Sequence, residues 1–198
     1  MQKIGTVIFV QIQREPLKLI QNPDNTHDDR IYRPQLIERV EHLKLTPQGI
    51  IGVGTDGIEV IDVHNETHPQ TRYRGDNQLS FGFLQHYERM RERFGDHIKD
   101  GDGGENIVLD ADIDLAKFTS HSKRFFFKRD ETTIEIADVI PAPPCRPFSV
   151  YCANQDIHGK ELKSALQFLD NGTRGYYGKL VSEGDNLVVQ AGDTLWMA

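Results

Sequence analysis

Short apolar runs, most of them alternating with polar positions, recur along this chain. β-branched and aromatic residues fill these runs, and Gly, Pro, Asn and Asp separate them. This pattern is typical of strands joined by tight turns. Strands are predicted over residues 3–12, 58–63, 107–109, 125–127, 132–140, 148–152, 175–181, 186–190 and 193–196.

Two stretches have the periodicity of helices instead. The first is predicted to begin with Ser80 as N-cap and to end at Phe94, before a glycine at the C′ position. The second covers residues 160–170, whose leucines share one face. Residues 34–45 fit either a helix or a strand. Many short strands with two helices predict a mainly β (α+β) fold, a closed β-barrel decorated with two or more helices.

Composition limits the possible functions. A chain of 198 residues is expected to form one domain, residues 1–198. The net charge of −7 argues against nucleic acid as a partner. The chain has no run of about 18 apolar residues, so no membrane span is predicted. The first ten residues lack a signal-peptide cleavage site, so a cytoplasmic protein with reduced thiols at Cys145 and Cys152 is expected.

The stretch 141–148 is the first candidate for chemistry. Four prolines surround Cys145 and Arg146, which makes the backbone stiff and extended. A cation beside a cysteine favours the thiolate, the form that attacks electrophiles and binds metals. The alternative is a proline-rich connection between two strands in which Cys145 is an inert small hydrophobe. Cys152 is assigned a plain structural role.

A glycine-rich turn before residues 107–109 is the second candidate. Gly104 precedes Glu105 and Asn106, and paired glycines let backbone N–H groups approach an anionic ligand. The spacing fits neither a calcium-binding EF-hand loop nor a nucleotide-binding P-loop. An ordinary tight turn is the alternative.

Arginine and histidine supply the remaining candidates. Arg74 and Arg174 each stand immediately before a glycine, where a guanidinium can grip an anion that comes close. His64 and His68 have a spacing that binds metal on a helix, but Pro69 disfavours a helix, so the two rings need not converge.

Three pieces in a fixed order resemble one family. They are Gly-Gly-Glu-Asn-Ile-Val-Leu at 103–109, Ala-Pro-Pro-Cys at 142–145, and Thr-Arg-Gly-Tyr-Tyr-Gly-Lys-Leu-Val-Ser-Glu-Gly at 173–184 followed by Ala-Gly-Asp-Thr-Leu at 191–195. Together they resemble the MOSC domain, found at the C-terminus of molybdenum cofactor sulfurases and in stand-alone bacterial proteins. The resemblance is strongest over residues 50–198.

The resemblance implies a barrel like the inserted barrel domain of pyruvate kinase. It also implies an essential Cys145 that carries persulfide sulfur or ligates the metal of the molybdenum cofactor. The sulfur would come from a cysteine desulfurase partner, which alone would hold pyridoxal phosphate; a molybdenum enzyme is the other partner implied. Cofactor-lining positions carried over from the family are Gly104, Glu105, Asn106, Arg174 and Gly175, with Arg74 and Arg146 as supporting cations.

Three functions follow as hypotheses. The first is a protein that handles sulfur or molybdenum cofactor through Cys145. The second is a molybdenum-dependent reductase of N-hydroxylated compounds. The third is a non-catalytic ligand-binding barrel in which the cysteine is incidental. An enzyme of the first two kinds would be a sulfur transferase or an oxidoreductase.

Overall fold

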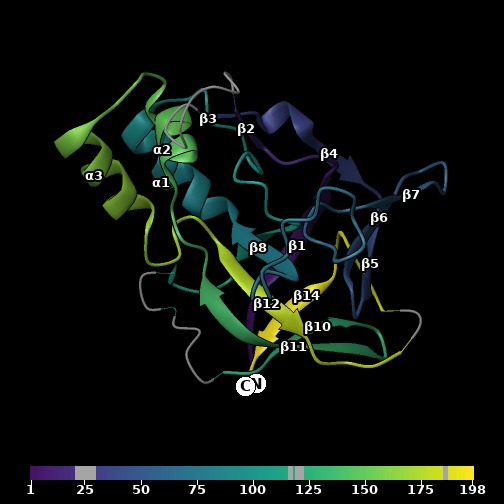
Figure 1. Ribbon diagram of the computed structural model, residues 1–198. Coiled ribbons are helices and arrows are strands. Elements are labelled where there is room, and N and C mark those ends of the chain that lie inside the picture. Colours follow the sequence, from purple (N-terminus) through teal and green to yellow (C-terminus); the bar gives the residue numbers. More distant parts are fainter. Residues whose placement is uncertain (21–29, 116–117, 119–122, 185–186) are drawn as a thin grey trace.

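Seven strands form a closed barrel, in which the first strand of the chain pairs with the last (Figure 1). The computed structural model describes residues 1–20, 30–115, 118, 123–184 and 187–198. Around the barrel the order is β14, β10, β11, β12, β8, β9 and β1, and β1 pairs with β14 to close it. The strands are β1 (Gln2–Gln13), β8 (Leu79–Phe83), β9 (Ile107–Ala111), β10 (Phe125–Arg129), β11 (Thr132–Pro141), β12 (Tyr176–Leu180) and β14 (Thr194–Met197). Closure removes unpaired strand edges from the sheet.

One neighbouring pair in the barrel is parallel. Strands β8 and β9 run the same way, and every other barrel pair is antiparallel. A parallel pair needs a crossover connection, which here contains helix α1 (Leu84–Phe94). The turn that delivers Glu105 to the start of β9 belongs to this crossover.

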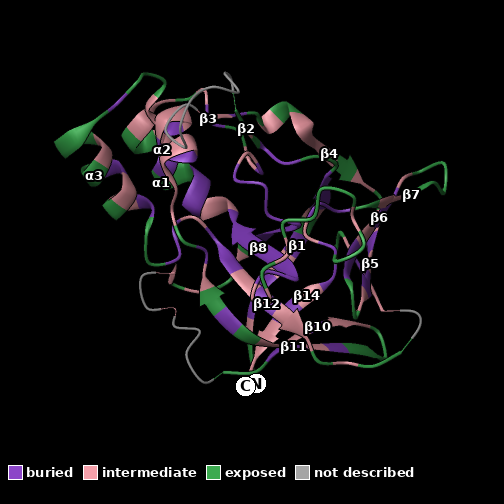
Figure 2. Ribbon diagram, viewed as in Figure 1, coloured by how far each residue is buried: buried purple, intermediate pink, exposed green. Residues whose placement is uncertain are grey.

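The barrel core is filled by buried apolar side chains that come from all seven strands (Figure 2). Strand β1 buries Ile4, Val7, Val10 and Ile12, and β10 buries Phe125 and Phe127. Burying one such apolar side chain contributes about 1.5–3 kcal/mol relative to leaving it exposed. In β10 the buried positions alternate with a period of two, which fixes the face of this strand that points inward.

Two smaller sheets and a short helical turn lie outside the barrel. One sheet has the order β13 (Val188–Gln190), β5 (His42–Thr46), β6 (Gly49–Val53) and β7 (Glu59–Ile61). The other is a two-stranded ribbon of β2 (Lys18–Ile20) and β3 (Arg30–Tyr32). Strand β4 (Ile37–Val40) extends the barrel sheet from β1 and follows a 3₁₀ turn over Pro34–Leu36.

Three helices gather at one end of the barrel (Figure 1). Helices α2 (Arg146–Ala153) and α3 (Gly159–Leu169) pack with α1 around a second apolar cluster. That cluster includes Tyr32 of β3 and Tyr87 of α1. None of the helices within the described ranges is long and apolar enough to cross a bilayer.

The predicted barrel with two or more helices is confirmed, and most predicted strands are present. Asn186, at the start of one predicted strand, lies outside the described residues. Residues 34–45, whose pattern fitted either a helix or a strand, form the 3₁₀ turn, strand β4 and most of strand β5.

Two assignments were wrong. Residues 148–152 are not a strand but part of α2, because Pro147 occupies the first helical turn, where a missing N–H costs nothing, and Cys145 is the N-cap. Ser80 is not an N-cap but a residue of β8, and the helix begins at Leu84. All five residues of β8 are buried, so its apolar positions do not alternate with exposed polar ones.

Candidate functional site: a cationic cavity beside the barrel

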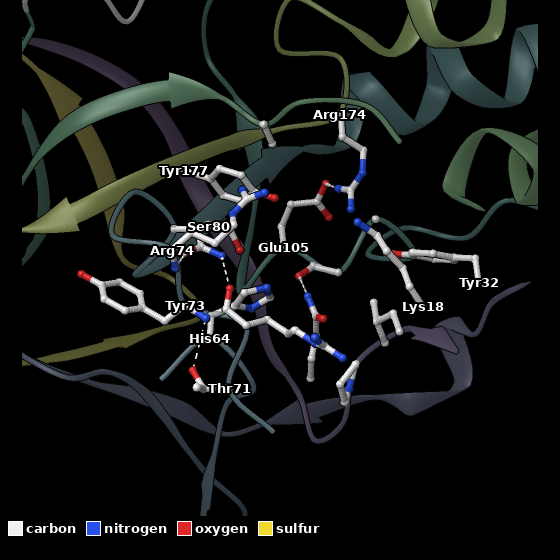
Figure 3. A pocket seen from close by; sticks show the side chains of 18 of the residues that line it. Lys18, Tyr32, His64, Thr71, Tyr73, Arg74, Ser80, Glu105, Arg174 and Tyr177 are labelled. Carbon is white, nitrogen blue, oxygen red and sulfur yellow. Dashed lines mark hydrogen bonds and ion pairs between the residues drawn. The ribbon is translucent and has the colours of Figure 1, made fainter. Parts of the chain in front are cut away.

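A cavity of about 360 Å³ lies where segments from distant parts of the chain meet (Figure 3). Its walls come from the β2–β3 ribbon, the loop 64–74, the turn before β9 and the start of β12. This volume is within the range of small-molecule sites, about 300–1,000 Å³. The barrel brings the walls together, because β12 pairs with β8 and β8 pairs with β9.

The cavity is strongly cationic in a protein whose net charge is −7. Among the described lining residues, one side chain is a carboxylate, Glu105. The lining cations are Lys18, Arg30, Arg72, Arg74 and Arg174. Such a concentration of one sign in a cleft attracts a ligand of the opposite sign.

Arg174 and Glu105 form a buried ion pair at the wall of this cavity. Nη1 of Arg174 donates to Oε1 of Glu105 across 3.2 Å, and the two side chains point toward each other (Figure 3). The Arg174 guanidinium also lies over the ring of Phe148, 4.4 Å from its centroid. On the other side, the Tyr87 hydroxyl donates to Oε2 of Glu105. These contacts fix both side chains in one arrangement.

Burial sets the protonation tendencies of the pair. It raises the pKa of Glu105, and the Arg174 charge and the Tyr87 hydrogen bond only partly offset it. Burial would lower the pKa of Arg174, but Tyr32 and Glu105 outweigh it and raise that pKa. Arg174 therefore keeps its positive charge beside a carboxyl that gains a proton more readily than usual.

Tyr32 connects the cavity to the helical cluster. Its hydroxyl donates to the carbonyl of Asp102 across 2.8 Å, and its ring packs against Phe148. Burial raises the pKa of Tyr32 well above its ordinary value, although the Arg174 charge opposes this. The phenol therefore stays protonated and anchors the turn that precedes Glu105.

Asn106, expected at the cofactor site, is used inside the fold. Its Oδ1 accepts from the backbone N–H and the hydroxyl of Ser80, at 3.1 and 2.9 Å. Its Nδ2 donates to Asp62 across 3.0 Å and to the carbonyl of Gln11 across 3.4 Å. It is not among the described residues that line the cavity. Asn106 therefore joins β8, β9 and β1 behind the cavity wall.

Two glycines of the expected site stand where a side chain does not fit. Gly104 has φ +79° and lines the cavity, and a Cβ there would lie 2.7 Å from Nε2 of Gln13. Gly175 has φ +94°, and a Cβ there would lie 2.8 Å from the carbonyl oxygen of Phe81. Glycine tolerates both the backbone angle and the close approach.

Cys145 is not among the described residues that line the cavity. Its side chain is half-buried at the N-terminus of α2 and packs against the second apolar cluster. The same cluster contains Leu17 and Tyr32, which line the cavity, so Cys145 is separated from the cavity by these side chains rather than exposed in it. The neighbouring Arg146 pairs with Asp156 across 3.2 Å and is also not among the described cavity-lining residues.

Arg74, expected at the anionic end of the ligand, lines the cavity and is half-exposed. Its Nε lies 3.6 Å from Asp76, and its guanidinium lies 5.5 Å from the centroid of the Tyr177 ring. An exposed pair of this length holds the side chain weakly. Arg74 can therefore turn toward a ligand at little cost.

Sequence reasoning missed several lining residues. Lys18, Arg30 and Tyr32 reach the cavity through the β2–β3 ribbon, which no local motif marks. His64 also lines the cavity and contacts the buried Asp62. The available signal was the Asp-Val-His spacing at the end of a strand, which places a carboxylate two residues before a ring.

His64 and His68 bind different groups. His64 contacts Asp62, whereas His68 Nε2 contacts the carbonyl of Arg14 across 3.0 Å. Within the part of the chain that the structure describes, no three His, Cys, Asp or Glu side chains are grouped so as to hold a metal ion.

Solved structures with this fold are known. The YuaD protein from Bacillus subtilis matches at a TM-score of 0.53 and 14% identity, covering 97% of this chain and 94% of that one. A crystal structure titled as a hypothetical protein matches at 0.51 and 16% identity, covering 98% and 67%. YiiM from Escherichia coli matches at 0.47 and 20% identity, covering 81% and 64%. No protein-family model and no curated protein matches the sequence.

These matches establish the fold alone. The chain is a closed-barrel protein with a cationic cavity, and the closed β-barrel expected from its sequence is present. What the cavity binds is argued below from its own residues.

Proposed function

We propose that this protein binds a phosphate-bearing anionic cofactor of the molybdenum cofactor class in the cavity, with Cys145 as the associated reactive thiol. The observation that carries the proposal is the excess of cations over carboxylates in a ligand-sized cavity next to a half-buried cysteine. The ordered motifs that resemble the MOSC family support the choice of cofactor.

The residues present fit such a group. A pterin phosphate needs cationic donors for its phosphate, and Lys18, Arg72 and Arg74 offer them at the cavity wall. Molybdenum favours a soft sulfur ligand, and Cys145 is a half-buried thiol that packs against the cluster containing the lining residues Leu17 and Tyr32. When bound, the cofactor would supply metal-centred redox chemistry.

The chain itself contributes position and charge. Glu105 and Phe148 hold the Arg174 guanidinium in the cavity wall. The thiolate of Cys145 is the form needed to accept sulfur from a persulfide or to bind metal. The proposed partner for sulfur delivery is a cysteine desulfurase.

Metal and pterin analysis of the protein as isolated tests the cofactor. The protein is expressed with molybdate, and its molybdenum and oxidised, fluorescent pterin are measured. We expect both in wild-type protein and in Cys152→Ser, with less molybdenum in Cys145→Ser. Protein without molybdenum or pterin would contradict cofactor binding.

Incubation with a cysteine desulfurase and cysteine tests sulfur transfer. Intact mass is expected to increase by one sulfur atom in wild type and in Cys152→Ser, but not in Cys145→Ser. An adduct that persists in Cys145→Ser would assign the sulfur to another residue.

A second candidate, a ligand-binding barrel without thiol chemistry, is favoured by one observation. Cys145 is not among the described residues that line the cavity. Cys145→Ser that retains full pterin and molybdenum, together with no sulfur adduct on the wild type, would support this candidate over the first.

A further inference from the structure

Asp62 and His64 form a pair at the cavity whose chemistry the proposed function does not use. Asp62 is fully buried at the end of β7, and His64 lines the cavity (Figure 3). The Asp62 carboxylate accepts from the backbone of Gln13 at 2.8 Å and from Asn106 at 3.0 Å. It also accepts from the His64 backbone at 2.8 Å and faces the ring Nδ1 at 3.1 Å.

These contacts keep the carboxylate ionised. Burial alone would raise the pKa of Asp62, but the hydrogen bonds and charge of His64 outweigh it and the net pKa is lowered. An ionised carboxylate only accepts hydrogen bonds, so Nδ1 of His64 must be the donor. In the neutral ring, Nε2 is then an acceptor.

That acceptor is available to a ligand. No hydrogen bond joins Nε2 of His64 to any of the described residues, and the ring forms part of the cavity wall. The other charged groups facing the same cavity are Lys18, Arg30, Arg72, Arg74, Arg174 and Glu105. Five of these are cations, which only donate hydrogen bonds, and the two oxygens of the sixth, Glu105, already accept from Arg174 and Tyr87.

We infer that His64, oriented by Asp62, makes the cavity selective for anions that carry a protic group, an O–H or N–H, beside their charge. The arginines and lysine bind the charge, and Nε2 of His64 accepts the hydrogen bond. The inference rests on the proposed function only in placing an anionic ligand in this cavity.

His68 provides an internal contrast on the same loop. Its Nε2 must donate to the Arg14 carbonyl at 3.0 Å, and its Nδ1 must accept from the Gln70 backbone at 3.0 Å. The two rings are therefore fixed in opposite tautomers, and His68 has no nitrogen left for a ligand.

The pair of tautomers is tested without a ligand. Nitrogen-15 NMR of histidine-labelled protein at about pH 8 should find the proton on Nδ1 in His64 and on Nε2 in His68. His64→Phe and His68→Phe assign the signals. A proton on Nε2 of His64 would overturn the inference.

Selectivity is tested with two matched inorganic anions. At about pH 8, hydrogen phosphate and sulfate are both dianions of tetrahedral shape, but only hydrogen phosphate carries an O–H group. We expect wild type and His68→Phe to bind phosphate about three- to tenfold more tightly than sulfate, the effect of one hydrogen bond. In His64→Phe the preference should disappear while sulfate binding remains.

The outcomes separate the two proposals. Equal binding of the two anions by wild type, or a phosphate preference that survives in His64→Phe, would overturn the role of His64. Failure of wild type to bind either anion would instead contradict the anion site of the proposed function, and the tautomer measurement would still report on the Asp62–His64 pair.

Discussion

Arg174 donates to Glu105 across 3.2 Å and so joins the turn before β12 to the turn before β9, 69 residues apart in the chain. Both side chains are nearly inaccessible to solvent. Because the pair lies in the wall of the cavity, the residues that shape the site also contribute to the stability of the fold.

Substituting Arg174 and substituting Glu105 should lower the free energy of unfolding by unequal amounts. Arg174→Met leaves the buried Glu105 without its cation, so we expect the free energy of unfolding to fall by about 3–5 kcal/mol. Glu105→Gln can still bond Tyr87 and Arg174, so a loss of about 1–2 kcal/mol is expected. Urea denaturation measures both. Equal losses would show that the unpaired carboxyl carries no special cost.

Gly175 and Gly192 separate backbone strain from steric contact. Their φ angles are +94° and +91°, but a Cβ at Gly175 would meet the Phe81 carbonyl at 2.8 Å, whereas one at Gly192 has no described atom within 4 Å. Gly192→Ala should cost about 1–2 kcal/mol from strain alone. Gly175→Ala should cost about 1–3 kcal/mol more. Thermal unfolding of the two variants side by side checks the difference.

His86 should make the protein sensitive to mild acid. Burial, with a smaller contribution from Arg89, lowers the pKa of His86 to about 4, and its ring packs 5.4 Å from that of Phe83. The unfolded chain binds a proton near pH 6.5, so stability is full above that pH and is lost as pH falls toward about 4.

The expected loss from His86 is about 2 kcal/mol between about pH 7 and pH 5. Denaturation of wild type and His86→Phe across this range isolates it, because the variant has no proton to bind at this position. Parallel curves for the two proteins would exclude His86 as the cause.

The two cysteines should differ sharply in reactivity. Cys145 is half-buried, whereas Cys152 is fully buried and burial raises its pKa to about 12. Iodoacetamide should therefore modify one thiol in native protein and two after denaturation. Cys145→Ser should lose the native reaction, and Cys152→Ser should keep it. Peptide mass spectrometry locates the label.

The barrel could be predicted from the sequence because the evidence for each strand lies within a short stretch of residues. Alternating apolar runs and turn glycines mark strands one at a time, and closure follows from their number and shortness. Helix α2 was not predicted, because four prolines around Cys145 favour an extended backbone. Proline is equally compatible with a first helical turn, and the local sequence does not show that Pro147 occupies one. Strand β8 was not predicted, because it is buried along its whole length and so lacks the alternation of apolar and polar residues that marks a strand.

The site was only partly accessible to the same reasoning. Gly104, Glu105 and Arg174 belong to recognisable local motifs, and the structure does bring them together. His64 lines the cavity, and Asp62, which orients its ring, is itself held by Asn106 and by the backbone of Gln13 from distant parts of the chain. Contacts of that kind depend on three-dimensional pairing, which a one-dimensional pattern does not encode.

The pairing of β1 with β14 imposes an order on synthesis. Strand β1 is synthesised long before β14. The edge of β1 that pairs with β14 therefore stays unpaired until Met197 has been made. A nascent or truncated chain would present that edge to other chains. Protein lacking residues 194–197 should therefore be prone to aggregate even though it retains every residue of the cavity.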